Sequence, residues 1–183
     1  MASNFGKTIQ VATFGASHGY AIGGIVEGLP CGHTIDIDEL QAFLKRRAPG
    51  QNQLQTQRKE ADIPEFLSGM VDGMLSGSPL AFMIRNTSQH SGDYNNLRDI
   101  PRPSHADFTA RMRYGDKVDM RGGGHFSARL TAPLCVAGGI ALQLLREKGI
   151  EIHGHLKQVG TIQDTPIDMV HPDMKALSEI ATE

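Results

Sequence analysis

Residues 102–129 hold the part of the sequence whose residue types best suit anion binding. The segment opens with Arg102 and His105, and three consecutive glycines, residues 122–124, lie between Arg121 and Arg129. Glycine loses much backbone entropy on folding and packs no side chain, so a run of it needs a reason. One reason is close approach of backbone N–H groups to an anion, which neighbouring arginines would help to bind. A flexible surface turn with solvated charges explains the same spacing equally well, and the residues alone leave both interpretations open.

Two histidines are placed where proton transfer is conceivable. His18 lies between Ser17 and Gly19, directly after a predicted strand, so we expect its side chain to be exposed above the sheet edge. His105 follows Pro103, and proline restricts the backbone around it to an extended path. Histidine has a pKa of roughly 6.5 and can give and take protons at neutral pH. A polar turn histidine without a chemical role is the alternative for His18.

Arginines also lie on both sides of a polar segment. A predicted helix ends in Arg46 and Arg47, residues 51–57 are mostly polar amides, and Arg58 follows. A mobile loop of this kind could close over an anionic substrate, with arginine forks binding phosphate or carboxylate oxygens. The alternative is that the cations at the helix end only complement the helix dipole.

Apolar periodicity predicts the elements that position these groups. Strands are expected at residues 9–14, 22–26 and 151–156, a strand pair joined by a Gly/Ser turn at 66–73 and 79–86, and helices at 39–45, 127–145 and 174–180. Asp36 or Asp38 can cap the first helix. The helix 127–145 is apolar on most sides and therefore predicted to be buried, with its positive dipole end directed at the glycine run.

Composition limits the class of protein. The chain has 183 residues, a net charge of −2 and 21 glycines, which favours one loop-rich α/β or α+β domain, residues 1–183. Neither a basic balance nor an aromatic-basic pattern points to nucleic acid, and the apolar run 130–145 is too short and too polar to span a membrane. Cys31 and Cys135 are far apart, so we expect a cytoplasmic protein with both thiols reduced and in the core. The scattered histidines predict no metal site.

Five blocks in the sequence resemble successive blocks of the chorismate synthase family, in the same order and at approximately the same spacing. They are Gly15-Ala16-Ser17-His18-Gly19, Arg58-Lys59-Glu60-Ala61-Asp62, Ser91-Gly92-Asp93-Tyr94, Arg102-Pro103-Ser104-His105-Ala106-Asp107 and Asp119-Met120-Arg121-Gly122-Gly123-Gly124 through Ser127-Ala128-Arg129. Any one block is a weak signal, but five in order are specific. The resemblance runs from Gly6 to about Gln158.

The resemblance implies a fold and an activity. The fold is α+β, a β-α-β sandwich of the chorismate synthase type, of which this chain would be the N-terminal portion. The family converts 5-enolpyruvylshikimate 3-phosphate to chorismate by an anti-1,4-elimination of phosphate and a ring hydrogen. The reaction, a step of the shikimate pathway, needs reduced FMN without net redox change. Family members are cytoplasmic homotetramers, and NADPH is the implied reductant, whether it is used by a partner or by the enzyme itself.

The resemblance also assigns roles to particular residues. Proton transfer is implied for His18 and His105. Substrate binding is implied for Arg47, Arg58 and Arg129. Contact with FMN is implied for Arg102, His105, Ser127 and Ala128.

Three departures from the family pattern stand out. His125 occupies a position where many members have arginine, and Leu130 one where they have glutamate. Family members also continue well beyond the length of this chain, so a true fragment should bind FMN weakly and should not turn over. The alternative function is therefore a truncated, non-catalytic domain that keeps anion-binding or assembly contacts. A generic nucleotide-phosphate binder is disfavoured, because the glycine run fits neither GxGxxG nor GxxxxGK[ST].

Overall fold

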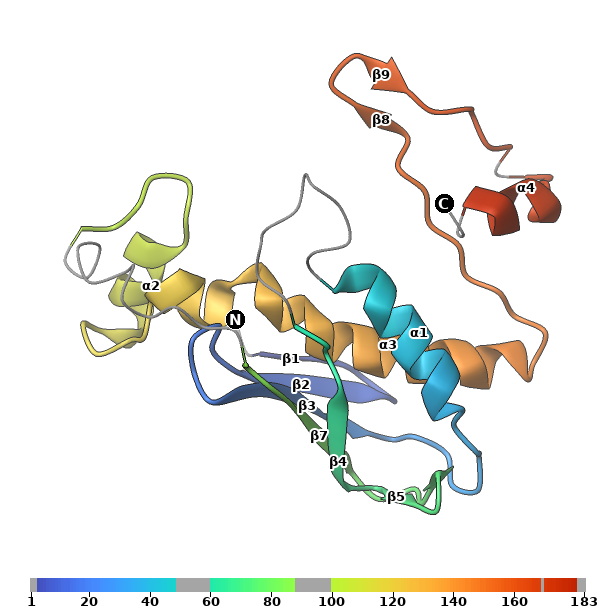
Figure 1. Cartoon of the computed structure of the whole chain (residues 1–183), viewed down its shortest axis with the longest axis horizontal. Helices are drawn as coiled ribbons and strands as arrows, with labels where there is room; N and C mark the ends of the chain where they lie inside the picture. The colour runs from blue at the N-terminus through green and yellow to red at the C-terminus, as the bar shows by residue number, and fades with distance from the viewer. Residues whose placement is uncertain (1–2, 49–59, 88–99, 169, 181–183) are drawn as a thin grey trace. The chain divides into compact units, whose positions relative to one another are not determined.

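The computed structural model describes residues 3–48, 60–87, 100–168 and 170–180 (Figure 1). The chain divides into two compact units, Met1–Leu144 and Leu145–Glu183, and each is described by itself. The first unit contains all the predicted site residues.

An antiparallel sheet of five strands is the base of the first unit. Its strand order is β1-β2-β3-β7-β4, with β1 at Asn4–Gly6, β2 at Gln10–Gly15, β3 at Ala21–Glu27, β7 at Leu80–Arg85 and β4 at Pro64–Ser68. Successive side chains of a strand point to opposite faces. Val26 pairs with Leu80 and Ile22 with Ile84 in the β3–β7 register, so these four buried side chains face the same side.

Two helices cover that side of the sheet. They are α1 (Ile37–Arg47) and α3 (Thr131–Arg146) (Figure 1). Leu40 of α1 and Val136 and Ile140 of α3 join the strand residues in one apolar core. Asp36 caps α1 as predicted, because its carboxylate accepts the backbone N–H of Glu39 at 2.9 Å. The predicted α+β class is confirmed, with a sheet and a helix layer in the described residues.

The predicted strand pair is correct only at its ends. β4 pairs with β7, but a small hairpin of β5 (Met70–Val71) and β6 (Met74–Leu75) replaces the simple Gly/Ser turn. Gly69 has a φ of +81° and Gly73 a φ of +76°, so each reverses the chain where an extended strand was expected. Apolar residues keep alternating through these turns, so periodicity alone predicted one strand where the structure has two.

The helix predicted at 127–145 forms, but it is not buried on most sides. It begins with the 3₁₀ turn η3 (Ala128–Leu130) and continues as α3. Leu134 is 39% exposed, because the described residues cover α3 mainly on its sheet-facing side. The run Arg121–Arg146 is apolar and long enough to cross a membrane by length and composition, a test that core helices also pass. Only Thr131–Arg146 of it is α-helical, shorter than the roughly 20 residues that a bilayer requires.

The prediction that both cysteines lie in the core is wrong for one of them. Cys31 is exposed, in the segment between β3 and α1. Cys135 on α3 is half-buried against the core, and this burial raises the pKa of its thiol. Cys31 lies in a loop, where no helix or strand periodicity indicates which side chains are buried.

The second unit holds a short hairpin, β8 (Gln158–Val159) with β9 (Ile162–Gln163), and the helix α4 (Met174–Ile180). The helix has the predicted bounds. The strand predicted at 151–156 is wrong, since those residues are mostly exposed and join no sheet. A strand needs a partner for its backbone hydrogen bonds, which polarity alternation cannot reveal.

Adjacent glycines in α3 provide a matched test of helix packing. A Cβ on Gly138 would meet open space, whereas one on Gly139 would lie 2.5 Å from Cδ1 of Leu40 in α1. Gly138→Ala should raise the free energy of unfolding by about 1 kcal/mol through helix propensity. Gly139→Ala gains the same propensity but overpacks the buried helix contact, which costs about 1–3 kcal/mol. Urea unfolding of both variants checks this, and equal stabilities would contradict the close α1–α3 approach.

Candidate functional site

The turn after β2 carries His18 and is held by backbone hydrogen bonds. Gly19 N–H donates to the Ala16 carbonyl at 3.0 Å, and Ser17 N–H donates to the Gly124 carbonyl at 3.0 Å. His18 itself is only 8% exposed, which contradicts the expectation of an exposed side chain above the sheet edge. The glycine run of a distant segment packs against its ring, a contact that the local sequence does not indicate.

The glycine run exists because backbone must come close to backbone and to His18. Gly122, Gly123 and Gly124 have φ values of +57°, +89° and +55°, which break the helical geometry within the segment η2 (Arg121–Phe126). A Cβ on Gly122 would overlap the His18 ring, and one on Gly124 would overlap the Asp119 carbonyl oxygen. Of the two interpretations left open, a flexible surface turn is therefore wrong, and the tight packing of the run explains its glycines without an anion.

The two residues that depart from the family pattern, His125 and Leu130, both contact other parts of the protein. His125 lies between Gly15 and Ser3, with Nδ1 at 2.8 Å from the Gly15 carbonyl and Nε2 at 2.6 Å from the Ser3 hydroxyl. A carbonyl only accepts, so Nδ1 carries a proton and donates. Leu130 is buried in the apolar core. Both side chains thus position the start of α3 and the turn after β2.

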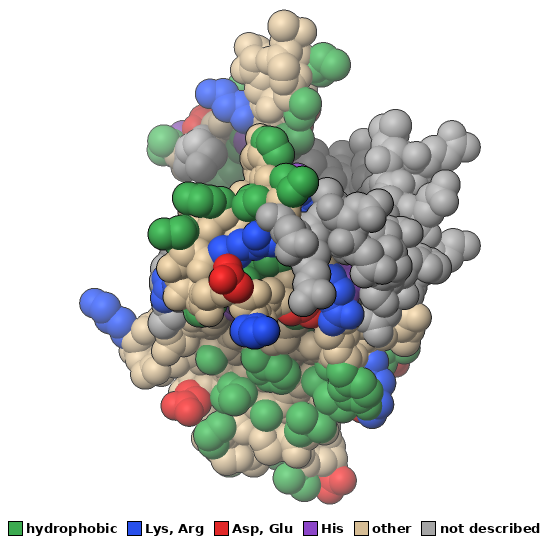
Figure 2. Space-filling model, turned by 90° about the vertical axis from the view of Figure 1, so that its left-hand side faces the viewer, with side chains coloured by type: hydrophobic (Ala, Val, Ile, Leu, Met, Phe, Trp, Pro, Cys, Tyr) green, Lys and Arg blue, Asp and Glu red, His purple; other side chains and the backbone are tan. Residues whose placement is uncertain are grey.

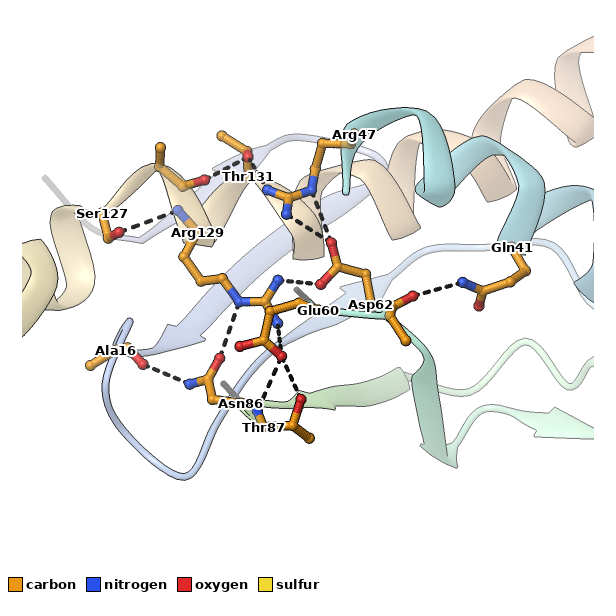
Figure 3. Close-up of polar contacts among 12 residues, drawn as sticks. Ala16, Gln41, Arg47, Glu60, Asp62, Asn86, Thr87, Ser127, Arg129 and Thr131 are labelled. Atoms are coloured by element: carbon orange, nitrogen blue, oxygen red, sulfur yellow. Dashed lines mark hydrogen bonds and ion pairs between the residues drawn. The ribbon is translucent and has the colours of Figure 1, made fainter. Parts of the chain in front are cut away.

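A buried carboxylate brings two of the predicted substrate arginines together (Figure 3). Asp62 is 2% exposed, and its Oδ2 accepts from Arg47 Nη2 at 2.7 Å and Nε at 3.2 Å. Its Oδ1 accepts from Nη1 of Arg129, which is itself 6% exposed. Arg47 Nη1 also donates to Thr131 Oγ1 at 3.1 Å. Charges this deeply buried are tolerated only when paired and hydrogen-bonded.

A second carboxylate lies beside Arg129. Glu60 Oε2 is 3.9 Å from Arg129 Nη2, and it accepts from the backbone N–H and the hydroxyl of Thr87 at 3.1 and 2.8 Å. Within the described residues, Nη2 of Arg129 has no hydrogen-bond partner. A buried guanidinium N–H in this state can still donate to an acceptor, such as an oxygen of an anionic ligand.

Asn86 connects the arginine pair to the His18 turn (Figure 3). Its Oδ1 accepts from Arg129 Nε at 3.1 Å. Its Nδ2 donates to the carbonyls of Ala16 at 3.1 Å and Gly19 at 2.8 Å. The side chain is therefore bonded to both sides of the site.

Arg102 and His105 lie in the segment that leads into α2 (Asp107–Tyr114). Arg102 forms a bidentate ion pair with Asp107, with Nε at 2.8 Å and Nη2 at 2.9 Å from its two carboxylate oxygens. The hydrogen bond from Arg102 is the main reason why the pKa of the Asp107 carboxyl is lowered. His105 is exposed, and its Nδ1 lies 2.9 Å from the Pro103 carbonyl.

Ser127 and Ala128 form the turn that leads into α3. The Ser127 hydroxyl accepts from the backbone N–H of Arg129 at 3.3 Å, and the Ala128 carbonyl accepts from Thr131 Oγ1 at 2.6 Å. The Tyr114 and Phe126 rings, 6.1 Å apart, connect the end of α2 to the segment before this turn. Figure 2 faces the α2 end of the molecule and shows charged side chains lying between groups of hydrophobic ones.

The structure thus brings Arg47, Arg129 and the His18 turn together, while Arg102 and His105 lie in the segment just before α2. Arg58 and the polar segment 51–57 lie outside the described residues. Three residues of the site had no predicted role: Glu60, Asp62 and Asn86. Glu60 and Asp62 belong to a block quoted above, and an acidic pair beside arginines was the available signal. Nothing but its position at a strand end marked Asn86.

Comparison with known proteins identifies close relatives of this chain. Residues 9–183 match the family model described as chorismate synthase. The chorismate synthase of Lancefieldella parvula is 46% identical over all of this chain and 48% of its own length. That of Bacteroides thetaiotaomicron is 44% identical over 99% of this chain and 54% of its own length. The chain therefore spans about half the length of the curated relatives it matches.

A solved structure is similar as well. A crystal structure of chorismate synthase aligns with a TM-score of 0.63 and 28% identity. The alignment covers 86% of this chain and 40% of the solved one. The likeness extends the sequence match to the arrangement of the elements.

Packing of the glycine run against His18 can be tested by adding one methyl group. Gly122→Ala should lower the free energy of unfolding for two reasons. An alanine held in the left-handed region costs roughly 1–2 kcal/mol, and the clash of its Cβ with His18 costs at least about 1 kcal/mol more. Gly73→Ala is the matched control, because Gly73 has a φ of +76° with open space around it. Thermal and urea unfolding should therefore place Gly122→Ala clearly below the control. Equal losses would mean that the run does not pack on His18.

The Arg102–Asp107 pair predicts a specific dependence on pH. A lowered carboxyl pKa in the folded state contributes stability above the unfolded pKa of about 3.9, and that contribution is lost as pH falls through the folded value. Asp107→Asn should cost about 1.5–3 kcal/mol at pH 7, and the difference from wild type should shrink below about pH 4. The exposed Asp116→Asn makes the same charge change and should cost far less. A pH-independent difference would argue against the ion pair.

Proposed function

This chain belongs to the chorismate synthase family, and we propose that it serves the reaction after which that family is named. That reaction is the anti-1,4-elimination of phosphate from 5-enolpyruvylshikimate 3-phosphate. The observation that carries the proposal is convergence. Arg47, Arg129 and the His18 turn, from three separate segments of the sequence, are joined through Asp62 and Asn86.

The arginines suit the charge of the proposed substrate, which has one phosphate and two carboxylates. Arginine complements such groups with paired, directional N–H donors. Arg47 keeps 21% of its side chain exposed, and Arg129 keeps an N–H without a described acceptor. Asp62 holds both guanidiniums in place before a ligand arrives. Preorganised charge of this kind favours a transition state in which phosphate leaves.

Two histidines would move protons. His105 is exposed, and the Pro103 carbonyl engages its Nδ1, so Nε2 is the nitrogen open to exchange a proton with a ligand. His18 is buried, with its ring packed against Gly122. A general acid or base works only within hydrogen-bond reach of the proton it transfers, so the proposal requires the ligand to reach both rings.

The donor set near α2 and the α3 turn fits a cofactor that is flat, apolar and anionic. Tyr114 and Phe126 offer aromatic surface there, both partly exposed, and Ser127 offers a hydroxyl. We assign the binding of FMN to Arg102, His105, Ser127 and Ala128, with Arg102 already oriented by Asp107. Reduced FMN, when bound, supplies electron density that helps phosphate leave. Use of NADPH, a cytoplasmic location and a homotetramer are proposed with it, on the family resemblance.

A second candidate function is favoured by one observation, the share of its relatives that the chain spans. At about half their length, the chain is also compatible with a domain that keeps anion-binding or assembly contacts without turnover. The two proposals differ in what the purified chain does with reduced FMN and the phosphate ester.

An anaerobic assay with reduced FMN and 5-enolpyruvylshikimate 3-phosphate tests the lyase proposal. Chorismate and free phosphate should form in equal amounts. His18→Ala and His105→Ala should each lower turnover at least about ten-fold, since acid–base groups typically contribute 10²–10⁴. His153→Ala, at an exposed position outside the first unit, should leave turnover unchanged.

The same assay decides between the two candidates. Micromolar FMN binding together with chorismate formation rejects the non-catalytic alternative. A folded chain that forms no chorismate supports that alternative and contradicts turnover by this chain. Unchanged turnover in a histidine variant removes that histidine from the mechanism.

A further inference from the structure

Asn86 lies just after β7, is 8% exposed, and is assigned above neither to ligand binding nor to proton transfer. Both N–H groups of its Nδ2 are used, one by the Ala16 carbonyl and one by the Gly19 carbonyl. Those carbonyls are on either side of His18. Its Oδ1 accepts from Arg129 Nε (Figure 3). One buried amide therefore closes the His18 turn and contacts the guanidinium.

The chemistry of the three partners permits only one orientation of this amide. Backbone carbonyls only accept hydrogen bonds and a guanidinium only donates them. The Nδ2 atom must therefore face the turn, and Oδ1 must face Arg129. A carboxylate at this position would keep the bond to Arg129 but would set an oxygen against two carbonyl oxygens. An alkyl side chain would satisfy neither side, so an amide is the side chain that fits.

Backbone hydrogen bonds hold the turn as well. Ser17 N–H donates to the Gly124 carbonyl at 3.0 Å, and the Asn86 backbone N–H donates to the Tyr20 carbonyl at 3.1 Å. The His18 turn thus lies between the glycine run and the end of β7. Of these contacts, only the Asn86 side chain also contacts Arg129 in the described structure.

We propose that Asn86 is a positioning residue, which sets the separation between the His18 turn and Arg129. It does not contact the substrate itself. A ligand that contacts both groups then meets them at a fixed distance, and small misplacements of reacting groups are costly in rate. The inference rests on the proposed function only for the roles of His18 and Arg129, since the coupling itself is a property of the fold.

Two substitutions distinguish the bonds of Asn86 to the His18 turn from its bond to Arg129. In Asn86→Asp the carboxylate still accepts from Arg129, but the turn loses both donors. In Asn86→Ala both connections are lost. Asn4→Asp is the control, because it makes the same chemical change at an exposed position on β1. Ring signals of His18, assigned by their loss in His18→Gln, and the Nε–H signal of Arg129 are followed by NMR.

We expect the His18 ring signals to move in both Asn86 variants and to stay in place in Asn4→Asp. The Arg129 Nε–H signal should remain protected from exchange in Asn86→Asp and lose protection in Asn86→Ala. In the lyase assay, well below the melting temperature of each variant, kcat should fall at least about ten-fold in both. A residue that only stabilised the fold would leave kcat per folded molecule unchanged. Unmoved His18 signals or an unchanged kcat would overturn the proposal.

A measurement on the wild-type chain covers the case in which the variants do not fold. Both side-chain amide protons of Asn86 should exchange slowly with water, because the side chain is 8% exposed and each N–H donates to a backbone carbonyl. Fast exchange of either proton would refute the link. If the wild type lacks lyase turnover, the proposed function fails. The NMR signals still decide whether Asn86 couples the two groups.

Discussion

The carboxylate of Asp62, shared between two guanidiniums, is the interaction on which the site depends. It joins the last residue of α1 to the 3₁₀ turn η3 before α3 through Arg47 and Arg129. Asp62 adopts a φ of +50°, a conformation that aspartate tolerates better than most residues. In the buried, low-dielectric surroundings an unpaired charge would be very costly, so the three groups stabilise one another only as a set. The set fixes the end of α1 beside the start of α3.

The glycine run has a geometric role that complements this ionic one. Gly122 and Gly124 allow the η2 segment to lie against His18 and the Asp119 carbonyl, where any side chain would clash. The turn after β2 is therefore held between backbone on one side and Asn86 on the other. Positive φ values and close packing at these glycines give this side of the turn a defined surface that leaves no room for side chains.

The two histidines differ in environment, and the difference is physical. His18 is buried and fixed by neighbours from distant segments, whereas His105 is exposed and its ring bonds only to a carbonyl two residues away among the described residues. The fold therefore gives the two imidazoles different surroundings: His18 is packed against the glycine run, and His105 is open to solvent.

Much of the fold followed from local pattern. Strands β2 and β3, helices α1 and α4 and the Asp36 cap lie where periodicity and capping residues indicated, because each depends on neighbours within a few positions. The β5–β6 hairpin, the absent strand at 151–156 and the exposure of Cys31 were missed. Each depends on a partner segment, or on its lack, and short-range apolar alternation carries no information about partners.

By itself, the sequence determined the family, the α+β class and the chemical types at the site, since motif order and side-chain chemistry are readable without coordinates. Only the tertiary structure decided which groups meet. Asp62 and Arg129 are 67 residues apart, and Asn86 and Arg129 are 43 apart. Whether such residues touch depends on the path of the whole chain between them. That path also decided that the glycines would pack on His18, because steric fit exists only between surfaces that have been brought together.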